Sequence, residues 1–117
     1  MDVDAELLEM IHSGNISATP IGRYFQAIRD RFPPEIVFDM VCYLRLHVEL
    51  AICAKGVLMM REAGFDAQAP PGTAEHFDEL HHLEKSIGRT GRLALMPFLH
   101  TTPRETFQLN MLERMVR

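Results

Sequence analysis

The sequence predicts an all-α domain, a bundle-like arrangement of five helices around one long central helix. Helix punctuation is strong, because prolines and capping residues stand directly before most of the periodic apolar segments. Strand signals are weak, because the chain has no Asn-Gly or Asp-Gly hairpin turn and no sustained alternation of apolar and polar residues. The stretch 35–63 contains no proline and would span about 45 Å as a helix. We expect the 117 residues to form one domain, 1–117.

The first two predicted helices are short. The first, about 3–12, can be capped by Asp2 or Asp4. The second, about 20–31, begins with Thr19-Pro20, which is the order of an N-cap followed by proline at the first helical position. The apolar face of this second helix is formed by Ile21, Tyr24, Phe25 and Ile28.

The long central helix is predicted to run from about 34 to 63, opening at Pro34 and ending before Gly64. Its apolar residues occupy more than one stripe. A helix that is apolar on several faces is central in a bundle or covered by another subunit. Arg45 and Glu49 stand four residues apart and are predicted to pair. Polar groups on such a helix, including His47, are expected to fix helix register or subunit pairing.

The last two predicted helices follow a loop. The fourth, about 73–97, is predicted to be capped by Thr73. The fifth, about 103–116, begins with Thr102-Pro103-Arg104-Glu105, which is a capping box with proline at the first helical position. These local signals define the boundaries of both helices.

Composition restricts the function. The formal net charge is −4, and nucleic-acid binders usually carry a basic excess, so we expect no nucleic-acid partner. Cys42 and Cys53 would lie roughly 16 Å apart on one helix, too far for a disulfide. Both are predicted to be buried free thiols of a reducing compartment, which indicates a cytoplasmic location. The most apolar region, 36–60, is not predicted to span a membrane because it contains Asp39, Arg45, Glu49 and Lys55.

The fourth helix carries the richest cluster of potential metal ligands. Glu75, Glu79 and His82 share one predicted face, and Glu79 and His82 form a Glu-x-x-His pair. Di-iron bundles combine such pairs with further glutamates from neighbouring helices. The residues that would complete such a site are Glu9, His12 and Glu49. The competing interpretation is a solvated polar face that binds no metal, and on that interpretation no cofactor is expected.

A basic stripe follows on the same helix, formed by Lys85, Arg89 and Arg92 and interleaved with Gly88 and Gly91. One interpretation is close helix packing or a kink at the two glycines, with the arginines facing water. The other is contact with anionic lipid or with an acidic surface of a partner. The sequence contains no Walker loop.

The run RFPPEIVFDMVCYLRLHVELAICAKGVLMMREAGF, with LEKSIGRTGRLAL after it, resembles the cytosolic region that follows the membrane helices in bacterial proteins of the PrsW family. The resemblance covers residues 31–95, about half of the chain. It implies a tail or accessory domain attached to, or in contact with, a membrane protein at the cytoplasmic face of the membrane. The catalytic motifs of that family have no counterpart in this sequence.

Two functions remain open from the sequence. The first is a non-catalytic interaction domain that forms a homo-oligomer, since no Ser/His/Asp or Cys/His motif is present. The second is a metal-binding helical bundle that uses the cluster on the fourth helix. A sensor with a small-ligand pocket between helices is a third class on which the sequence is silent.

Overall fold

The computed structural model describes residues 20–99 and 102–117, with side chains from residue 26 onward. These residues form four α-helices and one 3-10 turn, with no strand among them. The elements are α2 (Pro20–Arg31), α3 (Pro34–Glu62), α4 (Thr73–Leu95), η1 (Met96–Phe98) and α5 (Pro103–Met115). The all-helical fold around one long helix is therefore confirmed. The predicted first helix, 3–12, and the side chains of Ile21, Tyr24 and Phe25 lie outside the described residues.

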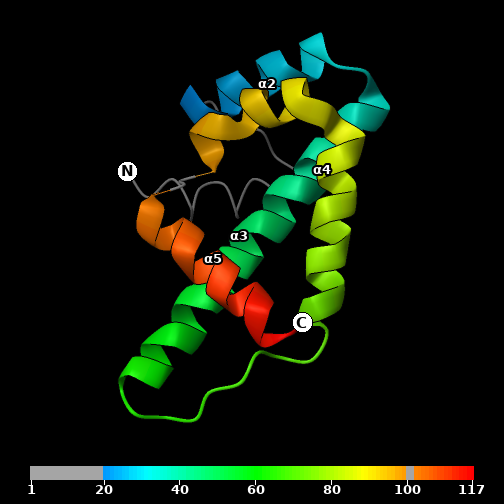
Figure 1. Cartoon of the computed structure of the whole chain (residues 1–117). Coiled ribbons are helices and arrows are strands. Elements are labelled where there is room, and N and C mark those ends of the chain that lie inside the picture. The colour runs from blue at the N-terminus through cyan, green and yellow to red at the C-terminus, as the bar shows by residue number, and fades with distance from the viewer. Residues whose placement is uncertain (1–19, 100–101) are drawn as a thin grey trace.

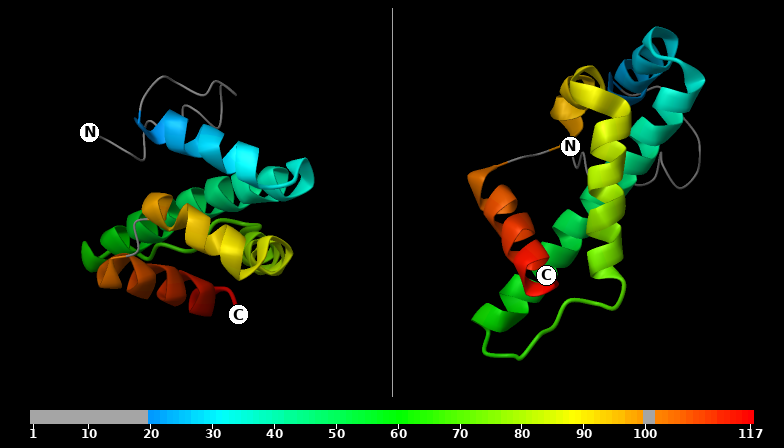
Figure 2. Two further views of the ribbon diagram at one scale, coloured as in Figure 1. Left: turned by 90° about the horizontal axis from the view of Figure 1, so that it is seen from above. Right: turned by 45° about the vertical axis from the view of Figure 1, so that its right-hand side comes forward.

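Helix α3 is the central element, and α4 and α5 make the most extensive contacts with it (Figure 1). Seen from above, α2 lies on one side of α3, and α4 and α5 lie on the other (Figure 2). The described helices fit an elongated shape of 47 × 30 × 25 Å. Proline opens α2, α3 and α5 at the predicted residues, because its missing N–H would be unpaired in a first turn anyway.

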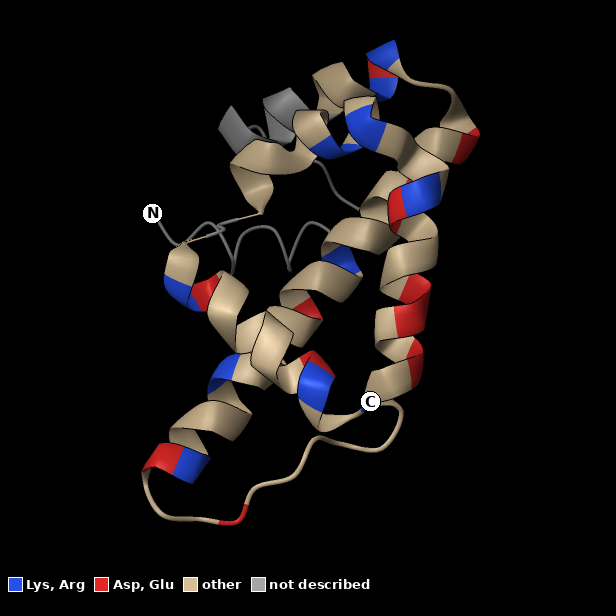
Figure 3. Cartoon of the chain, viewed as in Figure 1, with Lys and Arg blue, Asp and Glu red and all other residues tan. Residues whose placement is uncertain are grey.

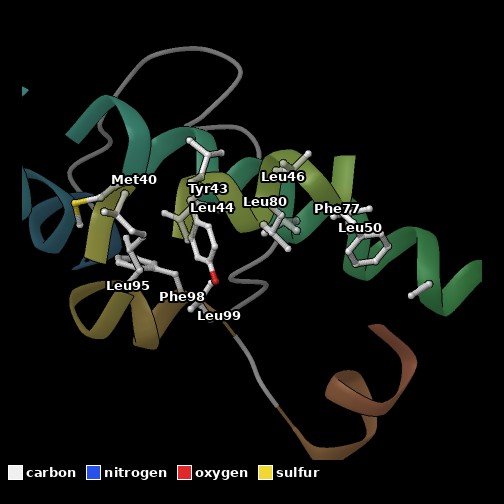
Figure 4. Packing of buried hydrophobic residues seen from close by; sticks show 14 of the residues in the cluster. Met40, Tyr43, Leu44, Leu46, Leu50, Phe77, Leu80, Leu95, Phe98 and Leu99 are labelled. Atoms are coloured by element: carbon white, nitrogen blue, oxygen red, sulfur yellow. The ribbon is translucent and has the colours of Figure 1, made fainter. Parts of the chain in front are cut away.

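The core forms where α3, α4 and η1 meet, and Ile28 of α2 and Leu112 of α5 are buried in the same cluster. Met40 and Leu44 of α3 and Leu95 of α4 are completely inaccessible to solvent. Side chains from α3, α4 and η1 converge at this point (Figure 4). Among the described residues, no helix combines the length and the apolar character that crossing a bilayer requires.

Helix α4 is bent at Gly88, one of the two glycines at which the sequence predicts close packing or a kink, and it ends at Leu95, two residues before the predicted end. Gly88 has φ 68° and ψ −177°, a conformation that essentially only glycine adopts. The chain changes direction there and passes into η1 after Leu95 (Figure 1). Gly91 is buried, and a Cβ atom at that position would lie 3.0 Å from the Cβ atom of Ile87. The kink at Gly88 and the close packing at Gly91 are therefore both present, while contact of the basic stripe with anionic lipid or with a partner stays a prediction.

The two predicted threonine caps differ in outcome. Thr102 accepts a hydrogen bond from the backbone N–H of Glu105 at 3.1 Å, so this cap is confirmed. Thr73 does not cap α4, because Gly72 occupies the N-cap position with φ 87°. The hydroxyl of Thr73 is buried and donates instead to the carbonyl oxygen of Pro70 at 2.6 Å. The hydroxyl of Thr73 is thus oriented towards the turn before α4, and the position before it, which serves as the N-cap, has no side chain.

Candidate functional site

A cluster of charged side chains joins the first half of α4 to the end of α5, and we call it the His81 cluster. Its members are Asp78, His81, Glu84, Glu113 and Arg117. The Nε2 atom of His81 lies 3.0 Å from Oε2 of Glu113, and its Nδ1 atom lies 3.2 Å from Oε2 of Glu84. Arg117 donates to Oδ1 of Asp78 at 2.8 Å and to Oε2 of Glu113 at 3.0 Å. The cluster therefore fixes the end of α5 against one face of α4.

The charges of the cluster shift the pKa values of its members. The hydrogen bond to Glu113 raises the pKa of His81, and the Glu84 carboxylate adds to this effect against a smaller opposing effect of burial. Burial on its own would raise the pKa of Glu113, but hydrogen bonds from Arg117 and His81 outweigh it and hold that pKa below its usual value. The His81 ring also stacks on Phe77, with 6.5 Å between ring centroids. His81 is thus held in place on two sides.

The polar contacts continue inward to α3 through Tyr43 and His47. The pKa of Tyr43 is raised mainly by burial; Glu84 raises it further and Arg92 lowers it. The His47 ring lies 6.0 Å from the Tyr43 ring. Burial lowers the pKa of His47, which favours the neutral imidazole, and the charge of Glu84 opposes this effect. These groups complete a polar connection between α3, α4 and α5.

The arrangement is suited to joining helices and offers no activated nucleophile among the described residues. Cys42 and Cys53 are free and half-buried, whereas the sequence had predicted full burial. Burial raises the pKa of both thiols, and the carboxylates of Asp39 and Glu79 raise that of Cys42 further. Both side chains are therefore protonated near neutral pH, and the thiol is a poor nucleophile.

Within the part of the chain that the structure describes, the predicted metal ligands of α4 do not converge with ligands on another helix. Glu75, Glu79 and His82 are all exposed. Glu49 of α3 pairs with Arg45 at 3.1 Å, as predicted. The described residues contain no group of three His, Cys, Asp or Glu side chains placed to hold a metal ion. Glu9 and His12 lie outside the described residues.

Sequence reasoning singled out His82, but its neighbour His81 makes the contacts between helices. The spacing of His81 and Glu84, three residues apart, was a usable local signal for part of the cluster. The spacing of Glu113 and Arg117, four residues apart, was another. No local signal connects His81 to Glu113, which is 32 positions further along the chain. That contact depends on how α5 packs.

Lys85, Arg89 and Arg92 are all exposed, but Gly88 separates the first from the other two. The regular spacing of a straight helix therefore does not apply across them. Acidic residues lie along the first half of α4 and basic ones follow, both before and after the kink (Figure 3). This order matches the helix dipole, which favours anions near the N-terminus and cations near the C-terminus. Glu84, Gly88, Arg89 and Arg92 contribute to the lining of an open cleft of about 400 Å³.

The second feature is the side of α3 that points away from the core, which we call the outer face of α3. It consists of Glu35, Phe38, Cys42, Arg45, Glu49, Ile52, Gly56 and Met59, which are exposed or half-buried. Cys42 lies at the edge of this face, because it also packs against the core cluster. Phe38, Ile52 and Met59 are 68%, 54% and 52% exposed, respectively. An apolar groove of about 680 Å³ lies at the carboxyl end of this face, lined by Gly56, Met59, Met60 and their neighbours.

The whole chain was compared with protein-family models, with curated proteins and with solved structures, and none of the three comparisons found a match. The resemblance to the PrsW family therefore stays a prediction.

Proposed function

We propose that this chain is a non-catalytic helical interaction domain whose binding surface is the outer face of α3. The observation that carries the proposal is the exposure of large apolar side chains along a helix that is otherwise the centre of the core. Exposed large apolar side chains on one side of a helix, here on both sides of the charged pair Arg45 and Glu49, are typical of interaction sites. Phe38, Ile52 and Met59 extend over about 32 Å of α3, given the rise of a helix.

The polar groups support a structural role for the other side of the molecule. The His81 cluster pairs charges of opposite sign between α4 and α5, and Ser86 donates to Asp39 between α4 and α3. Such contacts position helices relative to one another. They stabilise the platform on which the outer face of α3 is presented.

The setting that we propose is the cytoplasm, with the domain acting as an accessory to a membrane protein. Free thiols at Cys42 and Cys53 suit a reducing compartment. The exposed side chains of Lys85, Arg89 and Arg92 suit contact with anionic lipid headgroups or with an acidic surface of a partner.

The test is to determine the apparent mass of the tagged chain from its elution volume on size exclusion. The chain is kept at native abundance, in extracts of the cells that make it. We expect elution in an assembly heavier than the monomer. Combining Phe38→Ser with Ile52→Ser should return the chain to the monomer volume. The matched control is Phe107→Ser, because Phe107 is 62% exposed but lies on α5. Elution of the wild-type chain as a monomer, indistinguishable from the double variant, would contradict the proposal.

A further inference from the structure

We propose that the partner on the outer face of α3 is α3 of a second copy of this chain, packed antiparallel about a twofold axis. This inference rests on the proposed function and names the partner for the same surface. Three observations support it: the spacing of the exposed residues, the position of the apolar groove relative to Phe38, and the order of the two charges at the centre.

The residues of the outer face form one strip along α3. From Glu35 to Met59 they stand alternately three and four positions apart, which places them on one side of an α-helix. The strip is about 36 Å long. A second helix of the length of α3 is therefore able to lie along the whole strip when the two helices pack side by side.

The charges at the centre select the antiparallel orientation. Arg45 and Glu49 are 57% and 41% exposed at their side chains and form an ion pair with each other along the helix. In an antiparallel pair centred between them, Arg45 of each copy faces Glu49 of the other, which gives two opposite-charge contacts. In a parallel pair Arg45 would face Arg45 and Glu49 would face Glu49, and like charges oppose association.

The same register places the Phe38 side chain of one copy opposite the apolar groove of the other. With Arg45 opposite Glu49, Phe38 of one copy lies opposite Gly56 of the other, and Cys42 lies opposite Ile52. Gly56 lines the apolar groove, and nothing lies within 4 Å of where a Cβ atom would stand at this position. Phe38 is the most exposed of the large apolar side chains. A twofold axis repeats this contact, so that each groove receives one Phe38 ring.

The first test fills the groove without weakening the helix. Gly56→Leu introduces a side chain where Phe38 of the second copy would lie, and leucine is a better helix former than glycine. We expect sedimentation equilibrium to give a dissociation constant at least roughly tenfold higher than that of the wild type, with helix content by circular dichroism retained. Gly56→Ala is the matched control and should keep the dissociation constant within about threefold of the wild type. If Gly56→Leu and the wild type self-associate with equal affinity, Phe38 of a second copy does not lie in the groove at Gly56.

The second test addresses orientation. Arg45→Glu alone and Glu49→Arg alone should each weaken self-association by roughly thirtyfold or more, because two attractive contacts become repulsive. An equimolar mixture of the two variants should restore association, because each glutamate then faces an arginine. In a parallel pair Arg45→Glu would only replace one repulsion by another. An unchanged dissociation constant for Arg45→Glu therefore overturns the antiparallel register.

The outcomes separate this inference from the proposed function. If the purified wild-type chain is monomeric at about 100 µM, a range in which weak dimers are detected, the second copy is not the partner. If the chain in cell extracts then still elutes in an assembly that Phe38→Ser with Ile52→Ser disrupts, the outer face of α3 binds a different protein. In that case the proposed function stands and the dimer is overturned.

Discussion

The ion pair between His81 and Glu113 should make the attachment of α5 to α4 depend on pH. The pKa of His81 is raised above its ordinary value of 6.5, so its contribution is fully present below that pH and is lost as the pH rises through the folded-state pKa. The pKa of Glu113 is held below its ordinary value of 4.5, so its contribution is present above that pH and is lost as the pH falls through the folded-state pKa. The pair therefore stabilises most between these two ordinary values.

The magnitude is small because solvent screens the pair. The side chains of His81 and Glu113 are 44% and 25% exposed, respectively. Ion pairs with this degree of exposure contribute about 0.5 kcal/mol, within a range of roughly 0.2 to 1 kcal/mol. The apolar anchor of α5 is stronger, because Leu112 is completely buried and its truncation to alanine should cost about 3 kcal/mol. The ion pair thus tunes the position of α5 and does not by itself hold the helix.

The assay is a double-mutant cycle with His81→Gln and Glu113→Gln, followed by urea unfolding. The cycle is needed because Glu113 also contacts Arg117, whose charge persists as the pH rises. We expect a coupling free energy of about 0.5 kcal/mol at about pH 5.5, read from unfolding midpoints at a common slope. It should decrease as the pH rises through the folded-state pKa of His81, which lies above 6.5. A coupling free energy that is unchanged or larger at higher pH would refute the reasoning.

Two further predictions, each with a control variant, concern stability. Gly88→Ala should lower the free energy of unfolding by about 1–3 kcal/mol, because a residue with a side chain is strained in the backbone conformation of Gly88 even though nothing lies within 4 Å of a Cβ atom there. Its control is Gly56→Ala, in regular helix, which should change the free energy of unfolding little or raise it by up to about 1 kcal/mol. If urea unfolding shows that both variants lose the same free energy, the strained conformation of Gly88 is not the cause. Leu44→Ala should cost about 3 kcal/mol, since Leu44 is fully buried. For Leu93→Ala, at an exposed position, thermal denaturation should show a change within about 0.5 kcal/mol.

The helices were predictable because their boundaries depend on local chemistry. Pro20, Pro34 and Pro103 begin α2, α3 and α5 where the sequence predicts, and Met115 ends α5 one residue before the predicted end. A proline at the first helical position requires no information from elsewhere in the chain. The Thr102 cap is equally local, since its partner Glu105 is three residues away. The coarse fold follows from such signals together with the multi-faced apolar character of α3.

The details that the sequence did not predict depend on tertiary packing. A glycine within a helical pattern is compatible with a straight helix, so only the packing of the second half of α4 reveals that Gly88 adopts a positive φ. Thr73 is the first helical residue instead of the N-cap, and its hydroxyl donates to the carbonyl oxygen of Pro70 in the turn before α4. The partner of His81 was hidden because Glu113 approaches it only when α5 docks. Candidate metal ligands on one helix, such as Glu79 and His82, do not predict which residues of a neighbouring helix lie opposite them.

The long helix shows why apolar character alone does not separate core from interface. In sequence, Phe38 and Ile52 are indistinguishable in kind from Leu44 and Leu50, since all are large apolar residues on the same helix. In the structure the first two are exposed and the latter two are buried. Phe38, Ile52 and Met59 share one side of α3, and this arrangement is hidden in the sequence because other large apolar residues occupy the remaining sides. Substitutions on the inner side should therefore change unfolding, and those on the outer face should change association, so the two roles of α3 can be separated by experiment.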